Sequence, residues 1–172
     1  LTHKNSHKLK VKEWKKAFNA NWHQKWAEIP ILIPDKTNFR VTAIKRDKGH
    51  YIMINGLVHQ ENITILNIYA ANTGAPKFIK KLLIDLRNEI DSNTIIVGDF
   101  NTPLTALDRP SRQNVNKETM DLNYTLEQID LTDIYKTFHP TTTEYKFYSI
   151  AHGTFSKIDH MIGHKMNLNF IY

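Results

Sequence analysis

A predicted strand in this sequence ends at side chains that can perform acid–base chemistry. In residues 94–103, a run of β-branched residues indicates a buried strand that stops at Gly98. Asp99 and Asn101 follow, and on an extended chain two residues at this spacing point the same way. A carboxylate accepts a proton from water and a carboxamide donates hydrogen bonds to an oxyanion, so the pair suits metal-assisted phosphate hydrolysis. The alternative is an ordinary strand-to-loop turn, because Gly, Asp and Asn are also common turn residues.

Two further positions could contribute to such a site. Tyr69 ends the most hydrophobic predicted strand, residues 62–69, where its phenol could bond a phosphate oxygen. The alternative for Tyr69 is a tyrosine of the core or its rim. Asp159 and His160 are adjacent, so on a strand they point to opposite faces and cannot form a catalytic dyad with each other. An aspartate in the site would need an imidazole to orient or a metal ion, and we interpret His160 as structural.

A long polar loop follows the first motif. Residues 102–115 are rich in polar and basic side chains, as functional loops often are. Arg109 and Arg112 could contact a phosphate backbone, whereas the alternative is a solvated loop without a ligand. The histidines show no metal-ligand spacing such as HExxH, so no dedicated zinc site is predicted.

The elements that must position these side chains are mostly strands, with two helices between them. The helices are expected after Thr73, with Pro76 in the first turn, and near residues 116–129, with Asn116 as the cap. Strands are expected at residues 31–33, 39–45, 50–58, 62–69, 94–99, 144–149 and 155–163, with hairpins joining the second to the third and the sixth to the last. Residues 1–27 show weak periodicity and predict no definite element. The pattern indicates a layered α/β arrangement with mixed or antiparallel pairing.

Composition bounds the class of protein. A chain of 172 residues with 41% apolar and 23% charged residues is typical of one soluble domain with a sizeable core. No apolar run approaches the length of a membrane span, and no secretory signal is visible. The chain has no cysteine, which excludes disulfides and cysteine-ligated zinc and predicts a reducing compartment, nuclear or cytoplasmic. The formal charge of +6 suits a polyanionic partner, although many basic proteins bind none.

Five segments, in order along the chain, carry a family resemblance: NIYAANTGAP (67–76), GDFNTP (98–103), LDR (107–109), TEY (143–145) and SKIDH (156–160). Together they resemble the endonuclease domain of LINE (non-LTR) retrotransposon polyproteins, within the endonuclease/exonuclease/phosphatase superfamily of apurinic/apyrimidinic endonucleases and DNase I. The resemblance covers residues 1–172 and implies one domain, a four-layer α/β sandwich of two packed mixed sheets flanked by helices. It also implies Mg²⁺- or Mn²⁺-dependent nicking of double-stranded DNA, from which the polyprotein's reverse transcriptase domain primes.

The resemblance assigns roles to the candidate residues. Asp99 matches the carboxylate that activates or orients the attacking water, and Asn101 matches the amide that stabilises charge on the phosphate. Tyr69 matches the tyrosine that contacts the scissile phosphate. Asp159 matches the aspartate that pairs with the catalytic histidine.

The resemblance also implies a DNA-contacting hairpin. The segment from Lys146 to Ser156 matches a variable hairpin that enters the minor groove and helps to select the target. Lys146 stands where related LINE domains have a small hydroxyl residue. With Arg109 and Arg112, Lys146 and Ser156 complete the set of expected DNA contacts.

The family's site needs groups that this sequence does not contain. Its asparagine and metal-binding glutamate are expected upstream of Leu1, and its Ser-Asp-His triplet beyond Tyr172. We therefore expect a domain that is incomplete at both termini, with unknown metal ligands and without measurable specific nicking by itself. Two alternatives stay open: a non-catalytic nucleic-acid-binding remnant, and a phosphatase or phosphodiesterase of the same superfamily.

Overall fold

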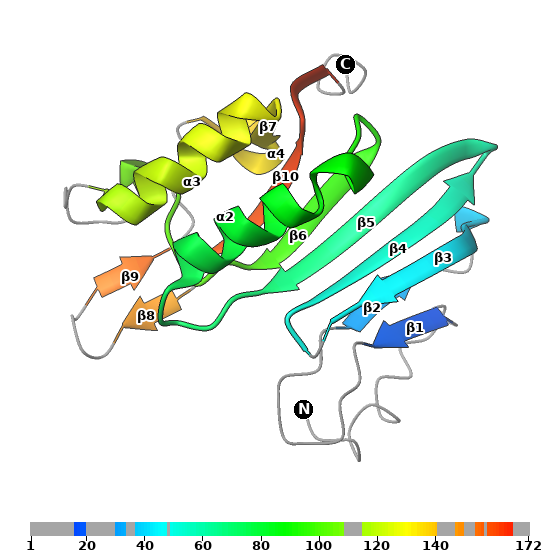
Figure 1. Cartoon of the computed structure of the whole chain (residues 1–172), viewed down its shortest axis with the longest axis horizontal. Coiled ribbons are helices and arrows are strands. Elements are labelled where there is room, and N and C mark those ends of the chain that lie inside the picture. Colours follow the sequence, from blue (N-terminus) through cyan, green and yellow to red (C-terminus); the bar gives the residue numbers. More distant parts are fainter. Residues whose placement is uncertain are drawn as a thin grey trace. The chain divides into compact units, whose positions relative to one another are not determined.

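The structure, a computed structural model, describes most of the middle of the chain. The described residues are 16–19, 30–33, 37–47, 49–108, 115–140, 147–149, 154–156 and 158–166. The chain divides into two compact units, Leu1–Tyr69 and Ala70–Tyr172. The described part of the first unit is built of strands, and the second unit combines strands with helices (Figure 1).

The first unit contains an antiparallel meander. Strands β3 (Arg40–Arg46), β4 (Tyr51–Val58) and β5 (Glu61–Tyr69) pair in that order. The predicted hairpin between β3 and β4 is confirmed. The turn between β4 and β5 consists of His59 and Gln60, with φ of 49° and 73°. Positive φ at both central residues is the geometry of a type I′ turn, which matches the twist of the strands it joins. A second pair in this unit joins β1 (Lys16–Asn19) to β2 (Pro30–Ile33).

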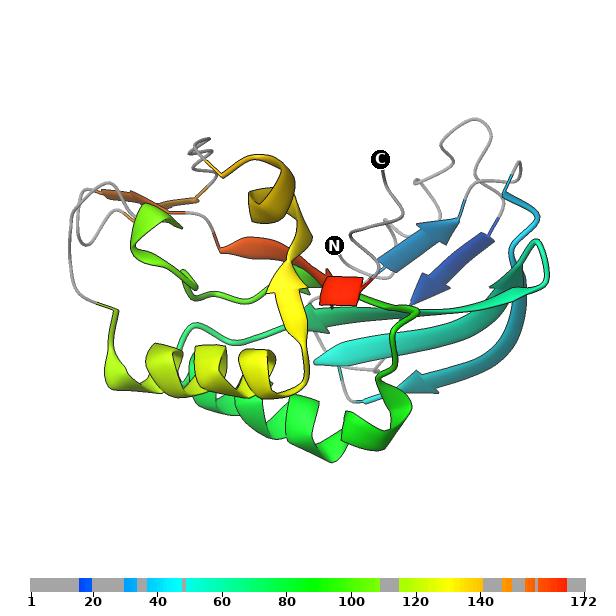
Figure 2. The same cartoon turned by 90° about the horizontal axis from the view of Figure 1, so that it is seen from above.

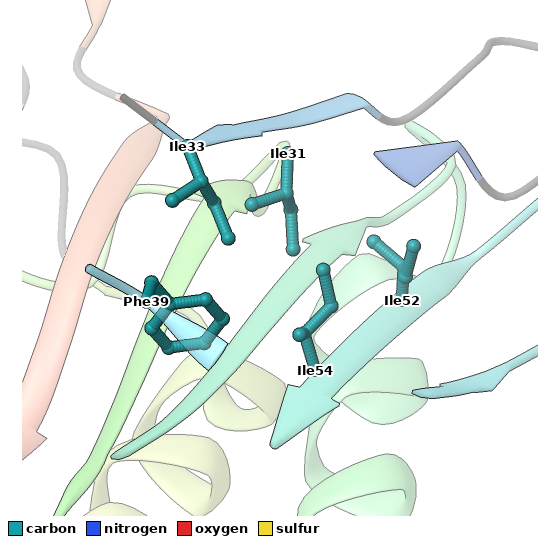
Figure 3. Packing of buried hydrophobic residues seen from close by; sticks show 5 residues of the cluster. All are labelled: Ile31, Ile33, Phe39, Ile52 and Ile54. Carbon is teal, nitrogen blue, oxygen red and sulfur yellow. The ribbon is translucent and has the colours of Figure 1, made fainter. Parts of the chain in front are cut away.

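Isoleucines and one phenylalanine form the core of the first unit. Side chains of a strand alternate between faces, so Ile52 and Ile54 of β4 share one face. They pack with Ile31 and Ile33 of β2 and with Phe39, and all five side chains are buried (Figure 3). This cluster is what holds β2 against the meander.

The second unit is an antiparallel sheet with two helices packed together. Strands pair in the order β6, β10, β7, and the unit also holds a short separate hairpin of β8 and β9. The strand bounds are β6 (Thr94–Asp99), β7 (Leu131–Asp133), β8 (Phe147–Ser149), β9 (Thr154–Ser156) and β10 (Asp159–His164). The helices are α2 (Ala75–Asp85), α3 (Lys117–Gln128) and α4 (Ile134–Phe138), with 3₁₀ turns η2 (Arg87–Glu89) and η3 (Ala106–Asp108). Helices α2 and α3 lie side by side along the same side of these strands (Figure 2).

The helix ends agree only in part with prediction. Asn116 caps α3, and its side-chain oxygen accepts the Thr119 N–H at 2.8 Å, as predicted. The predicted Thr73 cap of α2 is wrong. Gly74 occupies the cap position with φ of 73° and without a side-chain cap, because a left-handed residue is needed there.

The predicted final strand is divided in the structure. Residues 155–163 were expected to form one arm of a hairpin, but β9 ends at Ser156 and β10 begins at Asp159. Strand β10 pairs with β6 and β7 instead, because Ile162 belongs to the buried core of this unit. This change of partner places Asp159 opposite Asp99.

No helix within the described residues is long and apolar enough to cross a membrane.

The packing of the first unit predicts that the stability of the fold is sensitive to any side chain added at Gly56. A Cβ at this position of β4 would overlap the ring of Phe39, which is itself buried among isoleucines. We expect Gly56→Ala to lower the free energy of unfolding by ~1–3 kcal/mol, as overpacking does. Urea unfolding measures the loss.

Gly163→Ala is the matched control. A Cβ there would meet Cδ1 and Cγ1 of the half-buried Ile134, at 2.6 and 3.1 Å, and the flexible end of that side chain can rotate away. Phe39→Leu should restore part of the stability of Gly56→Ala. Equal losses for both alanine variants would contradict this account of the core.

Candidate active site

The candidate site is a turn at the end of β6. Gly98 has φ of 137°, a backbone conformation that favours glycine. Asn101 has φ of 45°, and asparagine is one of the few other residues that adopts this left-handed region. The Asn101 N–H donates to Oδ1 of Asp99 at 2.9 Å, so the carboxylate closes an Asx turn. The structure therefore contains the predicted strand-to-loop turn, and the same residues carry the carboxylate and the carboxamide.

The geometry corrects the reasoning that linked the two side chains. The sequence predicts that Asp99 and Asn101 point the same way, because residues two apart on an extended strand lie on the same face. The strand ends at Asp99, and the left-handed Asn101 departs from extended geometry. The Asx turn, not strand alternation, fixes the amide relative to the carboxylate.

Backbone groups of Ala70 brace this turn from the side. The Ala70 N–H donates to the Asp99 carbonyl at 2.9 Å, and the Ala70 carbonyl accepts from Nδ2 of Asn101 at 2.5 Å. A carboxamide nitrogen carries two hydrogens, so one remains for another acceptor. The amide is therefore held in place while it keeps a donor for a ligand.

Phe100 anchors the turn from below. Its side chain is 1% exposed, and its N–H donates to the Ile158 carbonyl at 2.9 Å. Its ring lies 5.3 Å from the His160 ring, tilted by 57°. Burial of this aromatic fixes the backbone between Asp99 and Asn101, because a packed ring of this size resists displacement.

Two carboxylates face each other across neighbouring strands. Asp159 of β10 is the direct antiparallel partner of Asp99. Burial raises the pKa of Asp99 above its ordinary value, and the negative charge of Asp159 raises it further. The Asn101 N–H and His160 act in the opposite direction but do not cancel this effect. A carboxylate with a raised pKa binds a proton more readily and is a better general base.

Asp159 and His160 point to opposite faces, as predicted. Asp159 is exposed, whereas His160 is buried between Asp133 and the Thr102 carbonyl. This arrangement is the one that the alternation of strand side chains requires.

Sequence reasoning missed a buried ion pair in the loop after the turn. Asp108 is 1% exposed, and its Oδ2 lies 2.7 Å from Nζ of Lys136. The same oxygen accepts the N–H groups of Leu104 and Thr105 at 3.0 and 2.7 Å. The pair thus ties the loop to α4. The sequence carried a signal for the helix that bears Lys136, but not for its partner. Asp133 stands three residues before Lys136, which is a helix-capping pattern, and its Oδ1 accepts the Lys136 N–H.

The remaining predicted site residues fall into two groups. Tyr69 ends β5 in the first unit, where it is half-buried and packs against the isoleucine cluster. Its role toward the phosphate stays a prediction. Arg109, Arg112 and Lys146 lie outside the described residues, as does the side chain of Ser156. Their DNA contacts stay predictions as well.

The described residues do not form a metal centre by themselves. None of their histidine, aspartate and glutamate side chains gather in groups of three or more that could hold an ion. Mg²⁺ is usually held by one or two carboxylates, with waters and substrate phosphates as its other ligands, and Asp99 and Asp159 would be the carboxylates at this end of β6.

Three solved structures share this fold. AP endonuclease LMAP from Leishmania major matches with a TM-score of 0.71 and 13% identity, over 99% of this chain and 68% of that chain. The endonuclease domain of TRAS1, a telomere-specific non-LTR retrotransposon, matches with a TM-score of 0.67 and 12% identity, over 90% of this chain and 68% of that chain. D. rerio TDP2 complexed with a single-strand DNA product matches with a TM-score of 0.61 and 8% identity, over 96% of this chain and 69% of that chain. At such identities the likeness shows the fold, and it confirms the predicted α/β class.

Sequence comparison supplies the family. The model of the endonuclease/exonuclease/phosphatase family matches residues 7–171. The chain therefore belongs to the endonuclease/exonuclease/phosphatase family, which groups nucleases with phosphodiesterases and phosphatases.

The opposed carboxylates predict a pH-dependent gain in stability on removal of one charge. Because the folded pKa of Asp99 is raised, its protonated form favours folding at low pH, and this stability is lost as pH rises through the folded pKa. Asp99→Asn cannot ionise and keeps the acceptor for Asn101. We expect it to be more stable than the parent at neutral pH by ~0.2–1 kcal/mol, the range for cross-strand charge pairs.

Urea unfolding at neutral and at acidic pH measures this difference, which should vanish at acidic pH. Asp85→Asn, at an exposed position of α2, serves as the matched control. An Asp99→Asn variant that is less stable than the parent at neutral pH would contradict the role of the charge.

The buried ion pair predicts a cost for losing Lys136. Lys136→Met leaves the Asp108 carboxylate buried without its cation, and we expect a loss of ~1–3 kcal/mol in unfolding free energy. Lys77→Met is the control, because the Lys77–Glu118 pair at 2.7 Å has 72% and 40% exposed side chains and should matter little. Equal effects of the two substitutions in thermal unfolding would rule out a special role for the buried pair.

Proposed function

We propose that this chain is a LINE-type endonuclease domain whose chemistry is hydrolysis of a DNA phosphodiester. The observation that carries the proposal is the braced turn at the end of β6. It holds a carboxylate of raised pKa beside a fixed amide donor, in a chain of the endonuclease/exonuclease/phosphatase family. The motif resemblance to LINE domains and the TRAS1-like fold support the finer assignment.

In the proposed reaction, Asp99 accepts a proton from water as the water oxygen attacks phosphorus. A P–O bond to the leaving sugar oxygen breaks, and that oxygen must take up a proton. The free N–H of Asn101 would donate to a phosphate oxygen as negative charge develops there. Reverse transcription can prime from the hydroxyl that such a nick exposes, which makes a reverse transcriptase domain the expected partner.

Other residues take the roles that the resemblance gives them. Tyr69 would contact the scissile phosphate, and Asp159 would orient a catalytic histidine. Basic and polar side chains would hold double-stranded DNA; these are Arg109, Arg112, Lys146 and Ser156. A divalent cation, Mg²⁺ or Mn²⁺, would supply Lewis-acid activation of the phosphate when bound. A nuclear or cytoplasmic location follows from a DNA substrate and the absence of cysteine.

One observation favours a second candidate function. The chain carries a formal charge of +6, which suits binding to a polyanion whether or not the polyanion is cut. A module that only binds nucleic acid would bind DNA with strong salt dependence and leave it uncut.

A plasmid-nicking assay distinguishes these functions. Supercoiled DNA and Mg²⁺ would be incubated with the 172-residue chain, with a version extended at both ends, and with the extended version carrying Asp99→Ala. We expect no specific nicking by the short chain and nicking by the extended one. Asp99→Ala should reduce the rate by ~10² or more, the usual contribution of a general base.

The extended chain with Asp85→Ala is the control, since Asp85 is exposed on α2. Efficient nicking by the short chain would show that all essential groups lie within it. An Asp99→Ala rate equal to that of the control would remove Asp99 from the mechanism.

A further inference from the structure

The buried ring of His160 has two partners from distant parts of the chain. Its side chain is 0% exposed, and Nδ1 lies 3.0 Å from Oδ2 of Asp133. On the other side, Nε2 lies 3.0 Å from the carbonyl oxygen of Thr102. The ring therefore joins the junction of β7 and α4 to the residue that directly follows Asn101.

Hydrogen-bond chemistry assigns the direction of the contact with Thr102. A carbonyl oxygen only accepts, so Nε2 carries a hydrogen that it donates to Thr102. Asp133 already accepts the Lys136 N–H through Oδ1, as an N-cap carboxylate does. Oδ2 of the same Asp133 side chain lies at hydrogen-bond distance from Nδ1, so the ring is held from both sides.

The contact with Thr102 completes the support around Asn101. Residue 101 is held on one side by the Ala70 carbonyl, which accepts its Nδ2. The next peptide is held by His160 through the Thr102 carbonyl, and the Thr102 hydroxyl lies 3.2 Å from that of Thr119. Because Asn101 is left-handed, its conformation persists only where neighbouring contacts fix it. The His160–Thr102 bond is one of the contacts that do so.

We propose that His160 is a positioning residue for Asn101, and that the donation from Nε2 to the Thr102 carbonyl is the part of its structure that matters. This inference rests on the proposed function for its catalytic consequence, but its structural part stands apart from any activity. A role confined to fold stability would depend on the packed volume of the ring and on Asp133. A positioning role depends on Nε2 alone, because Nε2 is the ring atom that bonds the Thr102 carbonyl.

Two substitutions separate the contribution of Nε2 of His160 from that of Nδ1. His160→Gln can place an amide N–H near the position of Nε2 and retain the bond to Thr102. His160→Asn can place one near Nδ1 and retain Asp133, but it is too short to reach Thr102. Both remove the ring and its contact with Phe100, so they lose similar packing. Leu122→Ala, at a fully buried position of α3, is a control for lost stability alone.

The first readout is structural and uses the 172-residue chain. The side-chain NH₂ resonances of Asn101, which donates to Ala70, report its position. We expect the parent, His160→Gln and Leu122→Ala to share these shifts and their slow solvent exchange. His160→Asn should lose both. Unchanged Asn101 resonances in His160→Asn would overturn the proposal.

The second readout is kinetic and uses the extended nicking form. His160→Asn should lower kcat by ~10- to 100-fold with little change in KM, because misplacement of a catalytic group costs this much. His160→Gln should recover most of the rate. If no extended protein nicks, the proposed function fails, and the Asn101 resonances still decide the positioning role. Equal losses of kcat in the two variants would overturn it.

A measurement on the parent chain covers the case in which neither variant folds. The Nε2–H of His160 should be visible by nitrogen-15 NMR and protected from exchange, unlike the ring of His50, whose side chain is 47% exposed. Exchange of the His160 Nε2–H as fast as that of His50 would overturn the assignment.

Discussion

The hydrogen bond from the Asn101 N–H to the Asp99 carboxylate is the interaction on which the candidate site depends. It closes the turn after β6 and requires left-handed backbone at Asn101 and the unusual φ of Gly98. Ala70 braces the turn through both of its backbone groups, and Phe100 fixes it from the core. The same carboxylate is the proposed general base. The Asp99 carboxylate therefore has two roles: one oxygen accepts the backbone N–H of Asn101, and the other is left to accept a proton from water in the proposed reaction.

The opposition of Asp99 and Asp159 shows where the fold departs from its most stable arrangement. Like charges directly across a strand pair destabilise a sheet. Sequences that specify a structure usually avoid such conflicts, and the exceptions concentrate at functional sites. Burial is the main cause of the raised pKa of Asp99, the Asp159 charge adds to it, and the raised pKa suits the proposed reaction. Stability lost at this position is exchanged for a more basic carboxylate.

Local signals in the sequence predicted local structure well. The β-branched run of residues 94–97 formed β6, and Asn116 capped α3, because strand propensity and capping act over a few residues. Contacts between distant residues escaped prediction. His160 meets partners 27 and 58 residues away, and Asp108 meets Lys136 28 residues away. The division of β9 from β10 also depends on tertiary pairing, which a single sequence does not encode in its periodicity.

The central claim is that Asp99 acts as a base whose pKa is raised in part by Asp159. The most direct test is the pH dependence of the single-turnover nicking rate of the extended domain, with and without Asp159→Asn. The rate should rise as Asp99 ionises, at a pH above the ordinary range for an aspartate, since the base form is the carboxylate. Removing the Asp159 charge lowers the pKa of Asp99, so the rise should move to lower pH even if the plateau falls. A rise that stays at the same pH in Asp159→Asn, or a rate independent of pH, would contradict the account.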